Sequence, residues 1–237
     1  MSLAEFLKLP GYELDGTHYE LDEGHLIALS PNARLHGVLM ARIAAYLDRV
    51  VDPKRFTVVC GDVGYILDKR EDRPTVRGAD VSVEATPADN WNRAQRAPNA
   101  LCAPNSPNVP EGFQDNAPFV AIEIISESNT NRDIQRKTAQ YLAAGGQEVW
   151  LVYPDTEETH VFRAAQQPPE VYGRGKSFLS CLGIRVNTDN CSRAERDYCG
   201  GFVGDAVGPE EPVFPLFCPK LLCPELFCPK LLCPNPL

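Results

Sequence analysis

The sequence has no long apolar run, no excess of positive charge and no closely spaced cysteine pair. No window approaches the roughly 20 apolar residues of a membrane-spanning helix, and no basic, apolar leader opens the chain. We therefore expect a cytoplasmic protein without a membrane segment. The formal net charge of −9 argues against a general nucleic-acid coating protein, which would be basic. The nine cysteines include no C-x-x-C pair, which argues against a zinc ribbon or a thioredoxin-type motif.

The last part of the chain differs from the rest in composition. Two ten-residue segments, 216–225 and 226–235, are identical at nine of their ten positions. Proline at every fifth residue there is incompatible with a helix or a central strand. We predict a folded domain over residues 1–186 and a disordered tail over residues 187–237, with the repeat arising from a duplicated stretch of gene. A structural or interaction protein whose tail mediates assembly stays open as an alternative.

Hydrophobic periodicity predicts an α/β fold with a mixed sheet flanked by helices and with N-terminal and C-terminal hairpins. A Pro- and Asn-rich excursion over 86–118 is long enough to be functional or disordered. The expected elements are a short capped helix from residue 3, a hairpin at 18–22 and 25–29, an amphipathic helix ending near residue 50, strands at 56–67, 76–85 and 119–125, a helix at 130–144, a hairpin at 148–153 and 159–163, and an edge strand within 171–186.

Glu123 is the most informative residue, because it interrupts the apolar run from Phe119 to Ser126. Both faces of this run are apolar, which predicts a central, buried strand. A carboxylate there is costly unless a cation, a metal or several hydrogen bonds compensate it. The next predicted helix carries Lys137. An acid in a core strand with a lysine on the following helix is typical of metal-assisted phosphodiester chemistry.

Four segments together carry a family resemblance. They are Tyr19-Glu20-Leu21 with Gly24 and Leu26, then Ser30-Pro31 followed by His36, then Ala79-Asp80-Val81-Ser82-Val83, and last Ile122-Glu123-Ile124-Ile125-Ser126 with Arg132-Asp133, Lys137, Tyr141, Gly145-Gly146 and Val149-Trp150-Leu151-Val152. Over residues 1–185 the chain resembles the Uma-type restriction endonuclease family of the PD-(D/E)XK nuclease superfamily. The resemblance implies a restriction-endonuclease-like fold and metal-dependent cleavage of DNA.

The resemblance also implies roles for individual residues. Asp80 and Glu123 would hold a Mg²⁺ or Mn²⁺ ion with the carbonyl of Ile124, since hard divalent cations prefer such oxygens. The ion would polarise the scissile phosphate and help to generate hydroxide. Lys137 would stabilise developing negative charge or position the attacking water, and Glu20 is a candidate for an additional acid. The candidate substrate contacts are His36, Arg132 and Arg136.

The sequence departs from the family pattern at three positions. Ile125 stands where the superfamily has a lysine, so that role would move to Lys137. Ala79 replaces the proline before the first acid, and Glu127 stands where the family usually has proline. These changes leave open a catalytically inactive nuclease-fold protein that binds DNA or a partner. If both strands are cut, a two-fold homodimer is favoured, but no segment identifies its interface or a recognition sequence.

Several of these residues also have simpler interpretations. Asp80 could cap a turn before a strand, and Glu20 could be a surface charge of the hairpin. Lys137 could pair with Asp133 one helical turn earlier, in the favourable acid-first order. His36, Arg132 and Arg136 could lie on solvated helix faces.

Overall fold

The computed structural model describes residues 1–9, 17–86, 112–126, 129–164 and 166–192. Three features of the sequence lie outside these residues: Glu127, most of the excursion at 86–118 and the repeat at 216–235. Among the helices in the described ranges, none combines the length and the apolar character needed to cross a bilayer.

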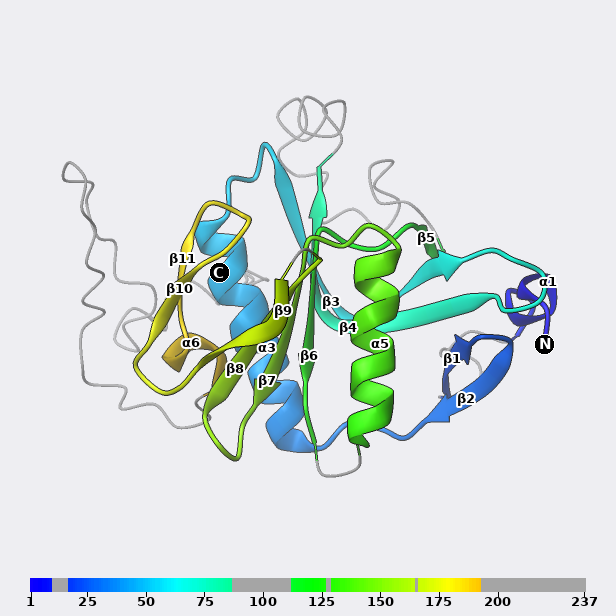
Figure 1. The fold of residues 1–237 in the computed structure, drawn as a ribbon, viewed down its shortest axis with the longest axis horizontal. Helices are drawn as coiled ribbons and strands as arrows, with labels where there is room; N and C mark the ends of the chain where they lie inside the picture. Colours follow the sequence, from blue (N-terminus) through cyan, green and yellow to red (C-terminus); the bar gives the residue numbers. More distant parts are fainter. Residues whose placement is uncertain (10–16, 87–111, 127–128, 165, 193–237) are drawn as a thin grey trace, which may run out of the picture. The chain divides into compact units, whose positions relative to one another are not determined.

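The described chain forms a mixed sheet with helices on both faces, which confirms the predicted fold class (Figure 1). The main path of the sheet runs β2-β1-β4-β6-β7-β8-β9, and β3 pairs with β4 and with β5. The elements are α1 (Leu3–Phe6), β1 (His18–Asp22), β2 (His25–Leu29), α3 (Arg34–Val50), β3 (Phe56–Asp68), β4 (Thr75–Ala85), β5 (Gln114–Asp115), β6 (Val120–Ile124), α5 (Asn131–Ala143), β7 (Glu148–Tyr153), β8 (Glu158–Arg163), β9 (Gln166–Tyr172), β10 (Ser177–Leu179), β11 (Arg185–Asn187) and α6 (Asp189–Ser192).

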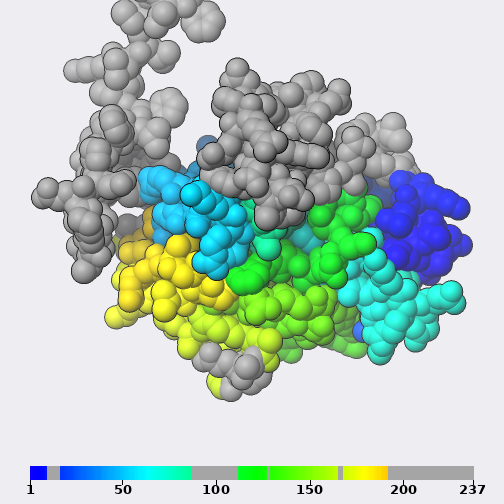
Figure 2. All heavy atoms as spheres, turned by 90° about the horizontal axis from the view of Figure 1, so that it is seen from above, coloured from blue at the N-terminus to red at the C-terminus, as the bar shows by residue number. Residues whose placement is uncertain are grey.

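The two long helices cover opposite faces of the sheet (Figure 1). Leu39, Ile43 and Leu47 recur every four residues along α3, so they share one side of the helix and pack into one apolar cluster with Ile122 of β6. In the space-filling view of Figure 2, light blue atoms of the region around residue 50 adjoin yellow atoms of the last described part of the chain. Fully burying such a side chain stabilises the fold by about 1.5–3 kcal/mol, so these contacts fix the position of β6.

On the other face, α5 packs Ile134 and Tyr141 against Ala121 and Leu151. Strand alternation gives Ala121 and Glu123 the same direction, so Glu123 faces α5. Val120, Ile122 and Ile124 pack on the α3 side of β6, and Phe119 just before the strand also packs there. A helix begins at this place because Thr130 caps it: its hydroxyl accepts a hydrogen bond from the amide of Asp133.

Strand β4 forks the sheet. One edge of β4 pairs with β3 along most of its length, while the other edge pairs with β1 at Val76 and with β6 from Val81 to Val83. Between these two partners lie Arg77, Gly78, Ala79 and Asp80. Backbone groups at an open sheet edge need other partners, and the amide of Gly78 donates instead to a side-chain carboxylate of β1. The fork thus gathers polar side chains inside the fold.

The prediction of a single edge strand within 171–186 is wrong. Strand β9 starts earlier and ends at Tyr172, and β10 pairs with β11 as a separate two-stranded sheet. Pro168 and Pro169 fit in β9 because it ends the sheet order, where a missing N–H is tolerated. The proposed domain boundary after residue 186 falls within β11, and Cys191 of α6 is buried in the main core. Residues 193–237 lie outside the described part.

Candidate active site

The two predicted metal ligands come from neighbouring strands. Val81 of β4 pairs with Ile122 of β6, so the next positions, Asp80 and Glu123, face each other across the ladder and share one side of it. The backbone amide of Ile124 donates to Oδ2 of Asp80 over 2.7 Å. Acids 43 positions apart in the sequence therefore meet at the fork. Asp80 is 5 % exposed and lies within β4, which excludes the turn-cap interpretation.

Lys137 points from α5 into the same place. Its Nζ lies 2.8 Å from Oε2 of Glu123 and 3.0 Å from Oε1 of Glu20. The alternative pairing with Asp133 is not formed: the carboxylate of Asp133 accepts a hydrogen bond from Thr130 at the helix start. A lysine carries three donors, so these two carboxylates leave one for another acceptor. The geometry brings a helix lysine to the strand acid, as the displaced-lysine prediction requires.

Glu20 is an interior residue of the site and not a surface charge of the hairpin. It is 4 % exposed, and its Oε1 accepts from the backbone amide of Gly78 over 2.9 Å. Its Oε2 accepts from Arg77 over 2.9 Å. Glu20 therefore bridges the open edge of β4 to the ammonium group of Lys137.

A second layer of ionic contacts holds Glu20 and the helix in register. Arg77, 4 % exposed at its side chain, also contacts Asp22 over 2.7 Å and donates to Gln140 over 2.8 Å. Asp22 in turn accepts from Gln140 and Arg136 of α5. A buried arginine with several carboxylate and amide acceptors is geometrically well defined. This network ties β1, β4 and α5 together around the predicted catalytic residues.

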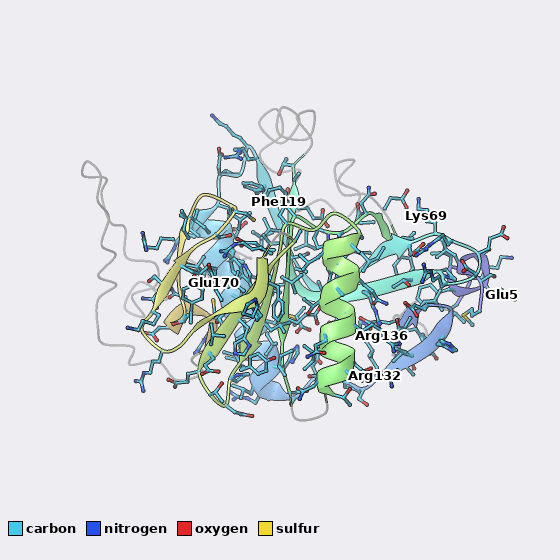
Figure 3. The ribbon with its side chains drawn as sticks, in the orientation of Figure 1. Glu5, Lys69, Phe119, Arg132, Arg136 and Glu170 are labelled. Atoms are coloured by element: carbon cyan, nitrogen blue, oxygen red, sulfur yellow. The ribbon has the colours of Figure 1, made fainter. Side chains whose placement is uncertain are left out.

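The three candidate substrate contacts lie in different surroundings. His36, in the first turn of α3, places Nε2 2.8 Å from Oδ1 of Asp80, so it belongs to the carboxylate cluster. Arg136 pairs with Asp22 over 2.9 Å, which directs it to the second layer. Arg132 is exposed near the start of α5, and both arginines are seen on that helix in Figure 3.

Burial and mutual repulsion give the acids different proton affinities. Burial raises the pKa of Glu123 to about 8, against the opposing influence of Lys137. Burial also acts to raise the pKa of Asp80, but His36, Lys137 and the Ile124 amide together bring it below its usual value. For Glu20, Lys137 and Arg77 similarly outweigh burial and lower the pKa. The pKa of Lys137 is raised: burial alone would lower it, but Glu123 and Glu20 more than compensate, so it is an ammonium group at neutral pH.

The pKa of His36 lies above its ordinary value for a related reason. Burial opposes its charged form, but the hydrogen bond to Asp80 and the charge of that carboxylate outweigh burial. His36 thus contacts Oδ1 of Asp80, whereas the Ile124 amide donates to Oδ2.

A divalent cation fits the donor set of this site. Oε1 of Glu123 is buried and accepts no hydrogen bond within the described part of the chain; leaving such an oxygen unpaired is costly. Carboxylate oxygens are what Mg²⁺ and Mn²⁺ prefer. Across the described ranges, no three His, Cys, Asp or Glu side chains are placed to hold a metal ion together. Lys137 and His36 contact oxygens of Glu123 and Asp80.

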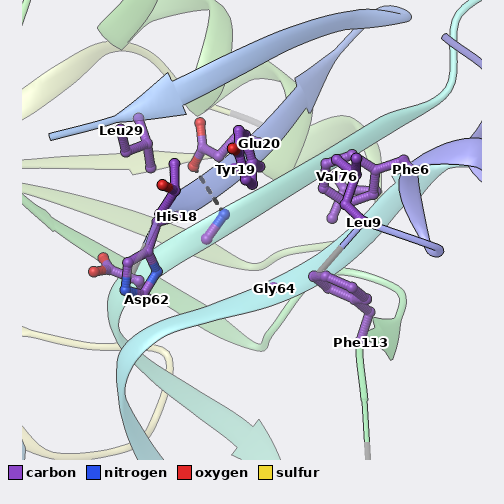
Figure 4. Close-up of a pocket in the computed structure, with 12 residues that line it drawn as sticks. Phe6, Leu9, His18, Tyr19, Glu20, Leu29, Asp62, Gly64, Val76 and Phe113 are labelled. Carbon is purple, nitrogen blue, oxygen red and sulfur yellow. Dashed lines mark hydrogen bonds between the residues drawn. The ribbon is translucent and has the colours of Figure 1, made fainter. Parts of the chain in front are cut away.

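Sequence reasoning missed Asp62 of β3. Burial and the adjacent Asp80 raise the pKa of Asp62 to about 6. Together with Glu20 and His18 it also lines a cavity of about 240 Å³ whose other wall includes Phe113 (Figure 4). The glycines at positions 61 and 64 indicate a bend in this strand. The strand pattern does not indicate which side chain such a bend redirects.

Arg77 was also missed. A single arginine in a strand is an ordinary sequence feature, and only the three-dimensional contacts with Glu20, Asp22 and Gln140 distinguish it.

The mixed sheet, its flanking helices and the fork define a protein with the restriction-endonuclease-like fold. A solved structure of a "putative nuclease belonging to DUF820" from Anabaena variabilis superposes with a TM-score of 0.62 and 22 % identity, over 81 % of this chain and 97 % of that one. At this identity the likeness establishes a shared fold. The chain belongs to the Uma2 family, described as "Putative restriction endonuclease", which matches residues 3–189. This confirms the family resemblance seen in the sequence. No curated protein matches the chain.

Proposed function

We propose that this protein is a metal-dependent endodeoxyribonuclease that hydrolyses phosphodiester bonds in DNA. The observation that carries the proposal is the meeting of Asp80, Glu123 and Lys137 at the fork of β4, with one oxygen of Glu123 buried and without a donor in the described structure. Membership of a family described as restriction endonucleases supports a nucleic-acid substrate. A buried carboxylate oxygen to which no described group donates favours a cation-binding role over a purely structural one.

Asp80 and Glu123 would hold a Mg²⁺ or Mn²⁺ ion. When bound, a divalent ion supplies Lewis-acid chemistry that withdraws electron density from a phosphate oxygen. Asp80 suits the role of a permanent ligand, because its surroundings keep it ionised. Glu123 would give up its proton when the cation arrives, since a cation and a proton compete for the same oxygens.

Lys137 would supply the fixed positive charge of the reaction. Its pKa is raised because Glu123 and Glu20 outweigh the effect of burial, so it cannot act as a general base at neutral pH. Its third N–H would donate to a phosphate oxygen, where negative charge grows in the transition state, or would hold the attacking water in line. Glu20 would orient this ammonium group, because Gly78 and Arg77 fix both of its oxygens. His36 would keep the carboxylate of Asp80 in place through the contact of its Nε2 with Oδ1.

The direct test is cleavage of supercoiled plasmid DNA by the full chain in Mg²⁺ or Mn²⁺. We expect nicked and linear products that are lost in EDTA and in Asp80→Asn. The matched control is Asp52→Asn, an exposed acid at the end of α3 outside the site, which should cut like the wild type. Plasmid that stays supercoiled under every metal and pH condition, with a folded protein, would exclude the proposed activity and leave the DNA-binding alternative.

A further inference from the structure

A cavity of about 240 Å³ borders the candidate active site. Glu20 and Gly78 belong to its lining, and Oε1 of Glu20 accepts from the Gly78 amide over 2.9 Å. The same oxygen lies 3.0 Å from Nζ of Lys137. One carboxylate therefore touches both the cavity and the lysine proposed to contact the phosphate. A strand whose phosphate is held at Lys137 would bring its adjoining sugar and base to this cavity.

The lining of the cavity has a polar end and an aromatic end (Figure 4). His18 and Asp62 stand together at one end, whereas Phe6 and Phe113 lie toward the other. Nucleobases are planar, with faces that stack on aromatic rings and with edges that carry hydrogen-bond donors and acceptors. A cavity with rings at one end and hydrogen-bonding side chains at the other matches both parts of such a ligand.

The ring of Phe113 is held in place and yet exposed. A Cβ added at Gly64 would lie 2.2 Å from Cδ1 of this ring, so the ring occupies the space that any other side chain at that position would fill. The centroid of the Phe6 ring lies 5.5 Å away, and the next residue, Gln114, pairs with Tyr65 of β3. Phe113 is nevertheless 42 % exposed, whereas Phe6 is buried. A fixed and exposed aromatic ring is the kind of surface on which proteins stack unpaired bases.

A bulge in β3 brings Asp62 to the polar end of the cavity. The register of β3 against β4 shifts between Cys60 and Val63, and bulges of this kind redirect side chains. Asp62 has φ +57°, a left-handed conformation that aspartate tolerates better than most residues. Its Oδ2 accepts from Asn32 over 3.3 Å. Because a carboxylate offers about four acceptor positions, Asp62 can also accept from a base amino group, as carboxylates do from N4 of cytosine.

The charge of the lining favours a base over a phosphate. The described residues that line the cavity include the acids Glu20 and Asp62 and no lysine or arginine. A phosphate would be repelled there, whereas Lys137, which contacts Glu20 and lies outside the lining, would attract one. The arrangement thus orients a nucleotide with its phosphate at Lys137 and its base in the cavity.

We propose that this cavity binds one nucleobase of the DNA substrate beside the phosphodiester bond that is cut, with the base stacked on Phe113 and its polar edge facing Asp62. A base within an intact duplex must leave the stack to enter such a cavity, and this costs least where the base is mismatched or single-stranded. The inference rests on the proposed nuclease function and adds a substrate class to it, DNA in which the nucleotide at the cut site is unpaired or easily unpaired.

The first test compares two fluorescein-labelled duplexes of equal length, one fully paired and one with a single cytosine opposite an abasic position. Both present similar numbers of phosphates, so they differ mainly in the cost of unpairing a base. Fluorescence anisotropy with the full chain in EDTA measures binding without cleavage. We expect the duplex with the unpaired base to bind at least about tenfold more tightly. Equal affinities, or tighter binding of the paired duplex, would overturn the proposal.

Variants of the stacking ring separate contact with the base from packing in the fold. Phe113→Leu keeps apolar bulk and removes the ring, so its affinity for the unpaired base should fall about tenfold, with a melting temperature near that of the wild type. Phe113→Tyr should keep the affinity. Gly64→Ala, which displaces the ring, should weaken binding similarly and serves if Phe113→Leu does not fold. Leu179→Ala, an exposed apolar change on β10, is the control and should stay within about twofold of the wild type. Unchanged affinity in both Phe113→Leu and Gly64→Ala would overturn the proposal.

The contact with the base edge has a readout of its own. Because the carboxylate of Asp62 accepts from an amino group, the wild type should bind cytosine opposite the abasic position more tightly than thymine. Asp62→Asn tolerates the left-handed backbone, and its amide donates as well as accepts, so this preference should be lost. The same preference in the wild type and in Asp62→Asn would contradict the assigned orientation of the base.

The outcomes also separate this inference from the function on which it rests. A chain that cuts plasmid in Mg²⁺ or Mn²⁺ but binds both duplexes equally would refute the role of the cavity alone and leave the nuclease proposal standing. Selective binding that depends on Phe113, without cleavage under any metal condition, would refute the nuclease proposal and support the cavity as a site for an unpaired base.

Discussion

Glu123 of β6 is a partly buried carboxylate with one buried oxygen, and Glu148 of the adjacent strand β7 is a fully buried carboxylate. Their surroundings are opposite. Glu148 is fully buried and accepts four hydrogen bonds, from Trp150, Arg163, Ser180 and the Cys181 amide. Glu123 accepts one, from Lys137, and its other oxygen has no donor among the described residues. Both positions carry the desolvation cost of a carboxylate. At Glu148 hydrogen bonds to both oxygens offset this cost, whereas at Glu123 one oxygen has no such bond among the described residues.

The difference separates two uses of the same side chain. Glu148 links β7 to Arg163 of β8 and to the turn at Ser180 through hydrogen bonds. Both of its oxygens are used by these contacts, so its role is structural. Glu123 keeps coordination capacity in a place where other acids gather. A saturated buried acid indicates stability, whereas an unsaturated one indicates binding or catalysis. Substitutions at the two positions should therefore affect different properties.

The largest effect should come from Glu123→Gln. We expect a loss of DNA cleavage of about 1000-fold or more, because the amide cannot hold the cation that stabilises the transition state. Thermal stability should change by no more than about 1 kcal/mol, since the hydrogen bond to Lys137 can be kept. Plasmid-cleavage rates and thermal unfolding measure the two properties. Unchanged cleavage in Glu123→Gln would contradict the proposed difference between Glu123 and Glu148.

Lys137→Gln should come next, with cleavage reduced by about 100- to 1000-fold through loss of a fixed positive charge. Mn²⁺ binding should persist, because the carboxylates remain and lose a competing cation. Single-turnover cleavage and calorimetry report these separately. Gln135→Ala, an exposed change on the same helix, is the control for the helix itself. Equal cleavage rates in both variants would contradict a special role for Lys137.

Glu148→Gln should show the reverse pattern. We expect the free energy of unfolding to fall by about 2–3 kcal/mol, less than for a wholly buried ion pair because Arg163 is partly exposed. Cleavage per folded molecule should stay near the wild-type value. Urea unfolding followed by circular dichroism gives the stability. An unchanged midpoint would mean that the four hydrogen bonds of Glu148 do not support the fold as described.

The smallest expected effect per pH unit is the dependence of stability on pH in the absence of metal. The pKa of Glu123 is raised to about 8 by burial, so between about pH 5 and pH 8 the folded state binds a proton that the unfolded state has released. Stability should therefore decrease as pH rises through this window, by up to about 1 kcal/mol per pH unit, and level off above it. Glu123→Gln should remove this slope, and Glu148→Gln should retain it. Unfolding in urea at several pH values, in EDTA, tests this.

The local parts of this molecule were readable from the sequence. The hairpin at 18–29, the helix ending at Val50 and the helix capped by Thr130 follow from alternation, helical periodicity and capping. The positions of Asp80, Glu123 and Lys137 followed from a buried charge and a family motif. Glu20 was named with them, although its burial was not evident from a short polar hairpin.

What the sequence could not supply depends on long-range contacts. Asp62 gains its meaning from a bulge, which depends on how β3 and β4 pair and not on β3 alone. Arg77 becomes distinctive only when Glu20, Asp22 and Gln140 arrive from other elements. The separate β10–β11 hairpin was missed because its strands have three residues each, too short to show a period.

The most direct measurement is anomalous diffraction from crystals of the full chain soaked in Mn²⁺. We expect a peak within ligand distance of Asp80 and Glu123, and none beside Glu148. An intact fold with no peak between the two acids, or with Mn²⁺ bound only elsewhere, would contradict the claim that the unsatisfied carboxylate at the fork is there to hold a metal ion.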